Sequence, residues 1–423
     1  MNGLGPSHTP HYLGFRSQTG LLLALLPCLL LALGSVPFGP GVLVSLVTTS
    51  LIWGGAVVLL PASTSPRFSS LCLLWLMSRV GALWIDSPSV DDDVYRYVWD
   101  GARLILDGTP YAHPPVDLFS QALSSEESWL ADELNHPHLA TVYGPVWIFF
   151  GAIAWLLTPT SLVGWKCLLI LAEAWTLWVS KRSLSMRSLL LWISCPLWFW
   201  ETMLQCHAEI LSVSFWYIAL TRLKAQRPIS AGLLLALALG GRWSMIVPLG
   251  VVILCARVPM TLRVRHMAGA LIGLVGLTAV TICLGPFDDS GLRALSAGWV
   301  FNPIIWKWFP TMPGAFWLLG TGLILILWAK PWDGDMREPN QSAAPMASWM
   351  LASSVINPWY FLWLVPALVE ETRLRWWSAW FIVVPIVYWQ AQWMGDAAHA
   401  ASLHHHPDVV WWVQFAAIVL GGL

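Results

Sequence analysis

The fold class is decided by residues 267–284, which read MAGALIGLVGLTAVTICL and contain no charged side chain. A helix that crosses a bilayer needs about 20 apolar residues, so this run is nearly long enough by itself. Comparable apolar runs lie at 42–60, 71–85, 146–157, 162–179, 189–200, 210–220 and 229–239, and more follow in the C-terminal half. The repetition predicts an all-α, polytopic membrane bundle.

The composition of the whole chain excludes an ordinary soluble protein. Of its 423 residues 57% are hydrophobic and only 11% are charged, whereas soluble domains carry about 25% charged residues. The net charge of −1 provides no basic surface for nucleic acid. We therefore expect residues 1–423 to form one transmembrane domain with roughly 13 to 15 membrane-embedded segments.

Several of the apolar runs are too short to cross a membrane as straight helices. Pro196, Gly240 with Gly241, and Pro358 interrupt or end such runs. Interrupted segments are tolerated at membrane depth where the backbone lines a cavity and is shielded from lipid. The sequence thus predicts broken helices around a recess that opens to one side.

The basic residues predict which side that is. Fifteen of the 22 Lys and Arg residues, among them Arg67, Lys181 and Arg222, fall in short loops on alternate turns of the chain. Such loops are cytoplasmic by the positive-inside rule. The parity requires residues 146–157 to be re-entrant. Residues 86–142 then form the first extracytoplasmic loop of a multi-pass cell-membrane protein, and the chemistry lies on the periplasmic, extracellular or lumenal face.

This loop is strongly acidic and contains a helical pattern. Eleven of the 23 acidic residues lie between Ile85 and Tyr143. From 93 to 107 the spacing is helical, with Val94 and Val98 on an apolar stripe and Asp93, Arg96 and Asp100 near one face. We expect an amphipathic helix on the outer surface with Asp93 as its N-cap.

The three consecutive acids Asp91, Asp92 and Asp93 have three interpretations. They could cap a helix and complement its dipole. They could form an Asp-x-Asp metal site for a nucleotide sugar, but nucleotide sugars are cytosolic and this loop is outside, so this interpretation is rejected. The third interpretation is a general base, since a partly desolvated carboxylate near other carboxylates has its pKa raised.

Four short motifs in this loop resemble the first outer loop of GT-C integral-membrane glycosyltransferases, in particular members that use polyprenyl-phosphate mannose. They are DVYRYVWDG at 93–101, GTPY at 108–111, NHP at 135–137 and TVYGP at 141–145. Gly144 stands where that family has a proline. Weaker similarities follow downstream in QCHAE at 205–209, GRWSMIVP at 241–248, with Arg242 where lysine is usual, and NPWYFLW at 357–363.

The resemblance implies inverting transfer of a hexose, mannose in the family, without a cofactor. Asp93 is the family-matched base, and Asp92 and Asp100 are further candidate catalytic carboxylates. Arg242 lies in an apolar segment, where charges are costly and usually functional, and its guanidinium suits a phosphate. His207 is expected to act on the leaving phosphate, and Glu209 is expected to hold the His207 side chain in orientation. The complete set of expected substrate-binding residues is Asp91, Arg96, Tyr143, His207, Glu209, Arg242, Trp359 and Tyr360.

The implied partners are a polyprenyl-phosphate sugar donor, a glycan or glycolipid acceptor and membrane lipids. A buried structural pair is an alternative role for His207 and Glu209. A lipid-linked sugar transporter or flippase would also use broken helices and intramembrane charges, although no internal repeat is visible. A polysaccharide ligase is a further alternative, but such enzymes centre on basic and histidine residues, and this loop is acidic.

Overall fold

The computed structural model describes residues 40–61, 64–85, 92–120, 123–242, 245–246, 259–297 and 357–365. Within these residues the secondary structure is helical and contains no strand, which confirms the expected all-α class for this part of the chain. The apolar runs in the C-terminal half beyond residue 297, apart from the segment 357–365, lie outside the described residues. So does Asp91.

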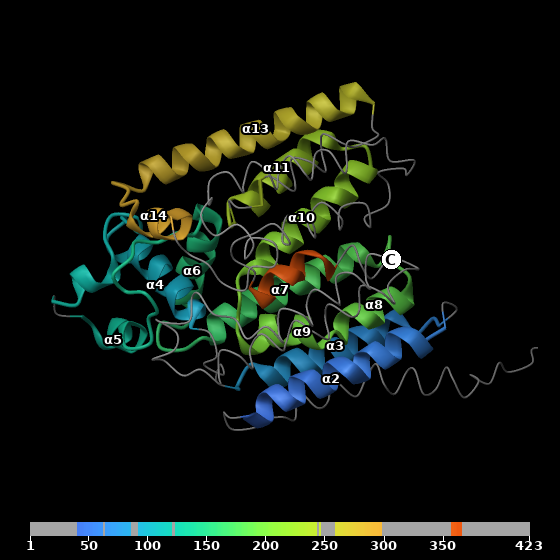
Figure 1. Cartoon of the computed structure of the whole chain (residues 1–423). Helices are drawn as coiled ribbons and strands as arrows, with labels where there is room; N and C mark the ends of the chain where they lie inside the picture. Colours follow the sequence, from blue (N-terminus) through green and yellow to red (C-terminus); the bar gives the residue numbers. More distant parts are fainter. Residues whose placement is uncertain are drawn as a thin grey trace, which may run out of the picture.

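The helices pack along one another as an elongated bundle (Figure 1). The long helices are α2 (Pro40–Leu59), α3 (Phe68–Ala82), α7 (Val163–Ser180), α10 (Glu209–Lys224), α11 (Pro228–Leu239) and α13 (Met260–Cys283). Helix α13 lies on α11 and α11 on α10, while α2 and α3 run along the opposite side of the bundle (Figure 1). The 3₁₀ helix η6 (Pro358–Trp363) lies against α10, far from it in sequence.

Two of the described helices are long and apolar enough to cross a membrane, namely α7 and α13. Helix α13 leaves much of its apolar surface uncovered by the described residues: Leu271 and Ile272 are each 63% exposed. Shorter apolar helices include α3, α11 and α6 (Pro145–Leu157). At 13 residues α6 is about 20 Å long, less than a hydrocarbon core of about 30 Å.

The helix interruption predicted at Pro196 is confirmed, whereas residues 298–356, which precede the one predicted at Pro358, lie outside the described part of the chain. Helix α8 (Met186–Ile193) ends shortly before Pro196, which starts the short helix α9 (Pro196–Phe199). A π-helical turn, η2 (Trp200–Leu204), follows directly. Proline has no N–H to continue a helix and fits its first turn. Gly240 ends α11, and Pro358 begins η6.

Buried or half-buried cations cap the C-termini of three neighbouring helices. Arg187 donates to the carbonyls of Val57 and Leu60 at the end of α2, at 2.8 and 2.9 Å. The Lys166 ammonium donates to the Ala82 carbonyl at the end of α3. The last carbonyls of a helix have no intrahelical donor and lie at the negative end of the helix dipole. A cation there donates hydrogen bonds to these carbonyls and interacts favourably with the dipole.

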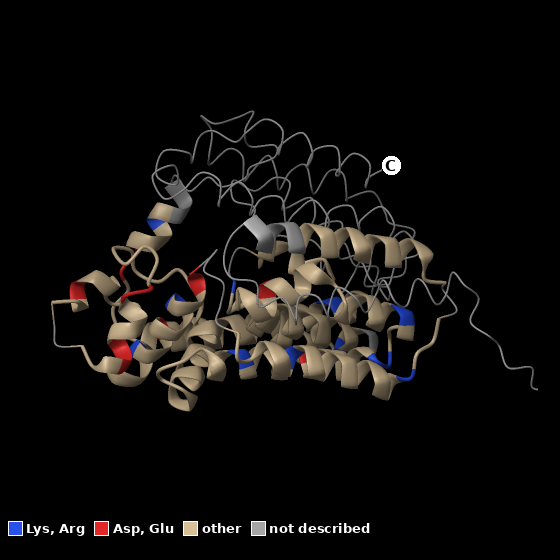
Figure 2. Cartoon of the chain, turned by 90° about the horizontal axis from the view of Figure 1, so that it is seen from below, with Lys and Arg blue, Asp and Glu red and all other residues tan. Residues whose placement is uncertain are grey.

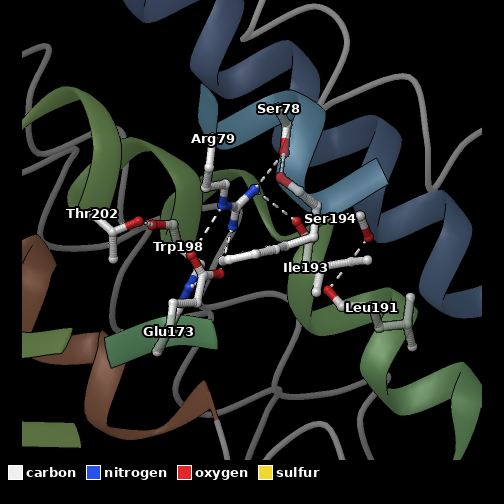
Figure 3. Close-up of polar contacts among 9 residues, drawn as sticks. Ser78, Arg79, Glu173, Leu191, Ile193, Ser194, Trp198 and Thr202 are labelled. Atoms are coloured by element: carbon white, nitrogen blue, oxygen red, sulfur yellow. Dashed lines mark hydrogen bonds and ion pairs between the residues drawn. The ribbon is translucent and has the colours of Figure 1, made fainter. Parts of the chain in front are cut away.

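The third of these cations, Arg79, is also part of a buried ion pair. Its Nη1 donates to the carbonyl of Ile193, the last residue of α8. Its Nε and Nη2 donate to the two carboxylate oxygens of Glu173 at 3.0 and 2.7 Å, and the Trp198 indole donates to the same carboxylate (Figure 3). Arg79 therefore connects α3, α7 and the break before α9.

The acidic loop forms a compact unit at one end of the bundle. Figure 2 shows that most of the acidic residues in the described part of the chain lie at that end. Helix α4 (Asp93–Leu106) packs on α6, and the capping box of α5 (Ser125–Ala131) is formed by Ser124 and Glu127. Two short 3₁₀ and α-helical elements, η1 (Pro115–Leu118) and α14 (Ser290–Ala297), complete it.

Helix α4 differs from its sequence prediction in two respects. Its N-cap is Asp92, so Asp93 is the first helical residue. It is also buried almost all round from Val94 to Arg103, because α6 approaches it closely. A Cβ placed on Gly151 would lie 2.1 Å from the Tyr97 carbonyl oxygen, so only glycine permits this approach.

Candidate functional site

The candidate base Asp93 lies at the start of α4 and is only partly buried. The side-chain amide of Asn135 donates from Nδ2 to Asp93 Oδ1 at 2.7 Å. The Tyr97 hydroxyl donates to Asp93 Oδ2 in a longer bond of 3.4 Å. The carboxylate is thus oriented by two neutral donors and remains within reach of a ligand.

Aromatic rings continue from Tyr97 into the bundle. Tyr97 meets Tyr143 edge-to-face with ring centroids 4.7 Å apart, and Tyr143 lies 5.5 Å from Trp147. Tyr97 also contacts Trp147 at 5.5 Å. Burial, followed by the nearby Asp93 carboxylate, raises the pKa of Tyr97 well above its usual value. Its phenol therefore stays protonated and remains a donor to Asp93.

Arg242 follows the end of α11 and faces these rings. Its Cζ atom lies 4.0 Å from the centroid of the Tyr360 ring and 5.6 Å from that of the Trp147 ring. Nη1 donates to Oε1 of the fully buried Glu209 at 2.5 Å. Its Nε is buried and has no hydrogen-bond partner among the residues that the structure describes. The guanidinium thus binds a carboxylate on one edge and lies over the rings of Tyr360 and Trp147, and its Nε–H is a donor that no described residue accepts from.

His207 lies behind this cluster and stacks on η6. The His207 and Trp359 rings are nearly parallel, with centroids 3.9 Å apart and an interplanar angle of 16°. His207 Nδ1 lies 2.9 Å from Glu201 Oε2, and both residues are fully buried. Glu201 belongs to the π-helical turn η2, and Cys206 just before the histidine has a left-handed φ of 60°. Such unusual backbone is frequent at functional sites.

The partners of His207 and Glu209 differ from the sequence interpretation. That interpretation made Glu209 the residue that orients His207. In the structure Glu201 holds the imidazole, and Glu209 pairs with Arg242. Glu201 lies within η2, whereas Glu209 is the first residue of α10, so the two carboxylates reach different partners.

Asp100 and Arg96 take part in packing the loop. Asp100 is 2% exposed, and Arg96 Nε donates to its Oδ1 at 3.1 Å. Burial raises the pKa of Asp100 above its usual value, and Arg96 opposes the shift without cancelling it. Arg96 also donates to the carbonyls of Leu139 and His136. Both side chains face the loop between α5 and α6.

The structure brings most of the expected residues into one continuous set of contacts. Asp93 contacts Tyr97, the tyrosine contacts Trp147, and Arg242 lies over Trp147 and Tyr360. The expected residues in this set are Asp93, Tyr143, His207, Glu209, Arg242, Trp359 and Tyr360. Three other expected residues lie outside it: Asp92 is the N-cap of α4, and Asp100 and Arg96 face the loop.

Four members of the set were not expected to act: Tyr97, Asn135, Trp147 and Glu201. Tyr97 stands four residues after Asp93, a spacing that brings two side chains together on a helix, so the sequence contained a signal for it. Asn135 lies in the NHP motif, but no local pattern assigns a partner to it, to Trp147 or to Glu201. Asn135 meets Asp93 across 42 residues, Trp147 meets Tyr97 and Arg242 across 50 and 95 residues, and Glu201 depends on the π-helical turn.

Within the described residues, no group of three or more His, Cys, Asp or Glu side chains is placed to hold a metal ion. Comparison with known protein families, with curated proteins and with solved structures found no match to this chain.

Proposed function

We propose that this chain is a polytopic membrane glycosyltransferase of the GT-C type. It would transfer a hexose, mannose by resemblance, from a polyprenyl-phosphate donor to a glycan or glycolipid acceptor on the extracytoplasmic face. The observation that carries the proposal is the placement of a partly buried carboxylate, Asp93, and a partly buried cation, Arg242, around the shared ring pair Tyr97 and Trp147.

In this mechanism Asp93 is the general base. The acceptor hydroxyl gives its proton to the carboxylate while its oxygen forms the new bond to C1 of the sugar. The bond between C1 and the phosphate oxygen breaks, and its electron pair stays on the leaving polyprenyl phosphate. Asp93 later releases the proton to solvent. Inversion at C1 is what the family resemblance implies.

Arg242 would bind the leaving phosphate through the donor that Glu209 does not occupy. A guanidinium offers two edges for oxygen acceptors, and Glu209 takes Nη1. The unpartnered Nε belongs to another edge. The ionic bond to Glu209 would fix the plane of the guanidinium, and the rings of Tyr360 and Trp147 would exclude water from it.

The exposed apolar surface supports a position in the membrane and a binding surface for the polyprenyl chain of the donor. Apolar side chains of α2, α3 and α13 are exposed, among them Leu51, Met77 and Val275. Uncovered apolar area of this extent is typical of a surface that faces lipid. The acidic end of the bundle (Figure 2) would then lie outside the membrane, where the candidate base meets its acceptor.

The direct test uses the purified chain in liposomes with radiolabelled polyprenyl-phosphate hexose and an acceptor membrane extract, with and without EDTA. We expect Asp93→Asn to lower turnover by about 10²- to 10⁴-fold, the usual contribution of positioned proton transfer, and to spare donor binding. Arg242→Ala is expected to weaken donor affinity first. Asp132→Asn, the same change at an exposed position of the same loop, is the control.

Near-normal turnover of Asp93→Asn would refute the role of this carboxylate. If turnover were lost instead in Asp92→Asn or Asp100→Asn, another carboxylate would be the base of the same mechanism. If none of these changes, nor Asp91→Asn, had an effect, the loop would be structural and a transporter would become the better proposal.

A further inference from the structure

The loop that joins α5 to α6 contributes one polar side chain to the candidate base. Asn135 Nδ2 lies 2.7 Å from Asp93 Oδ1, across 42 residues of sequence. Asn135 and Asp93 are both partly buried, so a ligand can approach the pair. The amide is a neutral donor, and its bond occupies one carboxylate oxygen.

The backbone that follows Asn135 is held by Arg96 of α4. Arg96 Nη2 donates to the Leu139 carbonyl at 2.7 Å, and Nη1 donates to the His136 carbonyl at 3.4 Å. Arg96 is in turn oriented by Asp100, through the bond from Nε to Oδ1. His136 adopts a φ of +41°, in the left-handed region. A residue with a Cβ keeps such a conformation only where its surroundings enforce it.

We propose that Asn135 is a positioning residue for Asp93, and that Arg96 and Asp100 act on the base through Asn135. Asp100 holds Arg96, Arg96 holds the 136–139 backbone, and this backbone places the Asn135 amide on the carboxylate. The catalytic meaning of this arrangement rests on the proposed function, whereas the arrangement itself can be tested without any activity.

The amide bond has two consequences for Asp93. It restricts the carboxylate rotamer through Oδ1, while the Tyr97 hydroxyl donates to Oδ2 in a longer bond of 3.4 Å. It also favours the ionised form, because the amide donates to a charged acceptor. Among the described residues, the titratable groups near Asp93 include Asp92, the preceding residue, and the phenols of Tyr97 and Tyr360; the charges of Arg242 and Glu209 act on both tyrosines, and Tyr143 acts on Tyr97. Replacing Asn135 changes none of these charges.

The test measures protonation of Asp93 directly. A water-soluble carbodiimide reacts with protonated carboxyl groups, and peptide mass spectrometry of the purified full chain gives the pH midpoint of Asp93 labelling. Losing one hydrogen bond to a carboxylate should move that midpoint upward by about one to two pH units in Asn135→Ala. Asn135→Asp keeps the shape and adds a negative charge, so its midpoint should rise further.

Matched variants separate positioning from general loosening of the loop. Glu133→Gln alters an exposed side chain two residues away and should leave the midpoint unchanged. Arg96→Lys, which cannot reproduce the forked contacts, should raise the midpoint by a smaller amount. Combining it with Asn135→Ala should add nothing further, because both act through one bond. An unchanged midpoint in Asn135→Ala and Asn135→Asp, with the chains still folded, would overturn the proposal.

The pH dependence of transfer then separates the two proposals. If the labelling midpoint and the acid limb of kcat/KM both move upward in Asn135→Ala, both stand. If the labelling midpoint moves while Asp93→Asn retains full transfer activity, Asn135 positions Asp93 as inferred and Asp93 is not the base. If Asp93→Asn abolishes transfer and neither profile moves, the base stands and the role of Asn135 is refuted.

Discussion

The buried pair of Arg79 and Glu173 permits a sharp prediction about stability. Both side chains are at most 1% exposed, and the pair is bidentate (Figure 3). We consider three variants: Arg79→Met, Glu173→Leu and the combination of the two. The apolar replacements have similar length, so that the main loss is charge and hydrogen bonding.

The expected magnitude follows from what each variant leaves behind. Arg79→Met removes four hydrogen bonds and leaves a buried carboxylate with the Trp198 indole as a donor. Glu173→Leu leaves a buried guanidinium. Removing one partner of a buried pair costs about 3–5 kcal/mol of unfolding free energy. The double variant leaves the neutral Trp198 N–H without the acceptor that Glu173 provides, at a cost of about 1–2 kcal/mol.

The coupling between the two positions is therefore predicted to be at least about 3 kcal/mol, with the double variant more stable than either single variant. Reversible unfolding in mixed micelles, followed by tryptophan fluorescence, gives the three free energies; the chain contains 31 tryptophans for this purpose. Additive losses, to within about 0.5 kcal/mol, would mean that the pair is not coupled as the geometry implies.

Two further predictions concern the acidic loop. Gly151→Ala should lower unfolding free energy by about 1–3 kcal/mol, because its Cβ would meet the Tyr97 carbonyl of α4, whereas Gly276→Ala, with open space around it, should not. Glu127 is partly buried, which acts to raise the pKa of its carboxyl, yet hydrogen bonds from Ser124 and the Arg103 charge bring that pKa below its usual value. Because the Glu127 pKa is lower in the folded state than in the unfolded state, ionisation stabilises the fold above the unfolded-state pKa. This stabilisation is lost as the pH falls through the folded-state pKa. The protection factors of the α5 amides, which are corrected for the pH dependence of intrinsic exchange, should fall below about pH 4.5, and Glu127→Gln should remove this fall; unchanged behaviour in the glutamine variant would contradict the assignment.

Helices could be predicted from the sequence because their signals are local. Residues 162–179 were expected as one apolar run and form α7, and the spacing after Asp93 predicted α4 to within one residue at both ends. The break at Pro196 follows equally directly from a missing N–H. The same local rules failed for the surroundings of α4, because nothing near Gly101 indicates that α6, with Gly151, would cover it.

The composition and the apolar runs by themselves determined an apolar chain and the helical secondary structure of its described residues, and the acidic loop provided Asp93 as the candidate base. Only the tertiary structure decided the partners of the buried charges: Glu201 for His207, Glu209 for Arg242, and Asn135 for Asp93. Periodicity acts over three or four residues, so it reveals which side chains are on a helix face. A buried charge or polar group takes whichever donor or acceptor the packing of distant segments brings within about 3 Å, and no local pattern contains that distance.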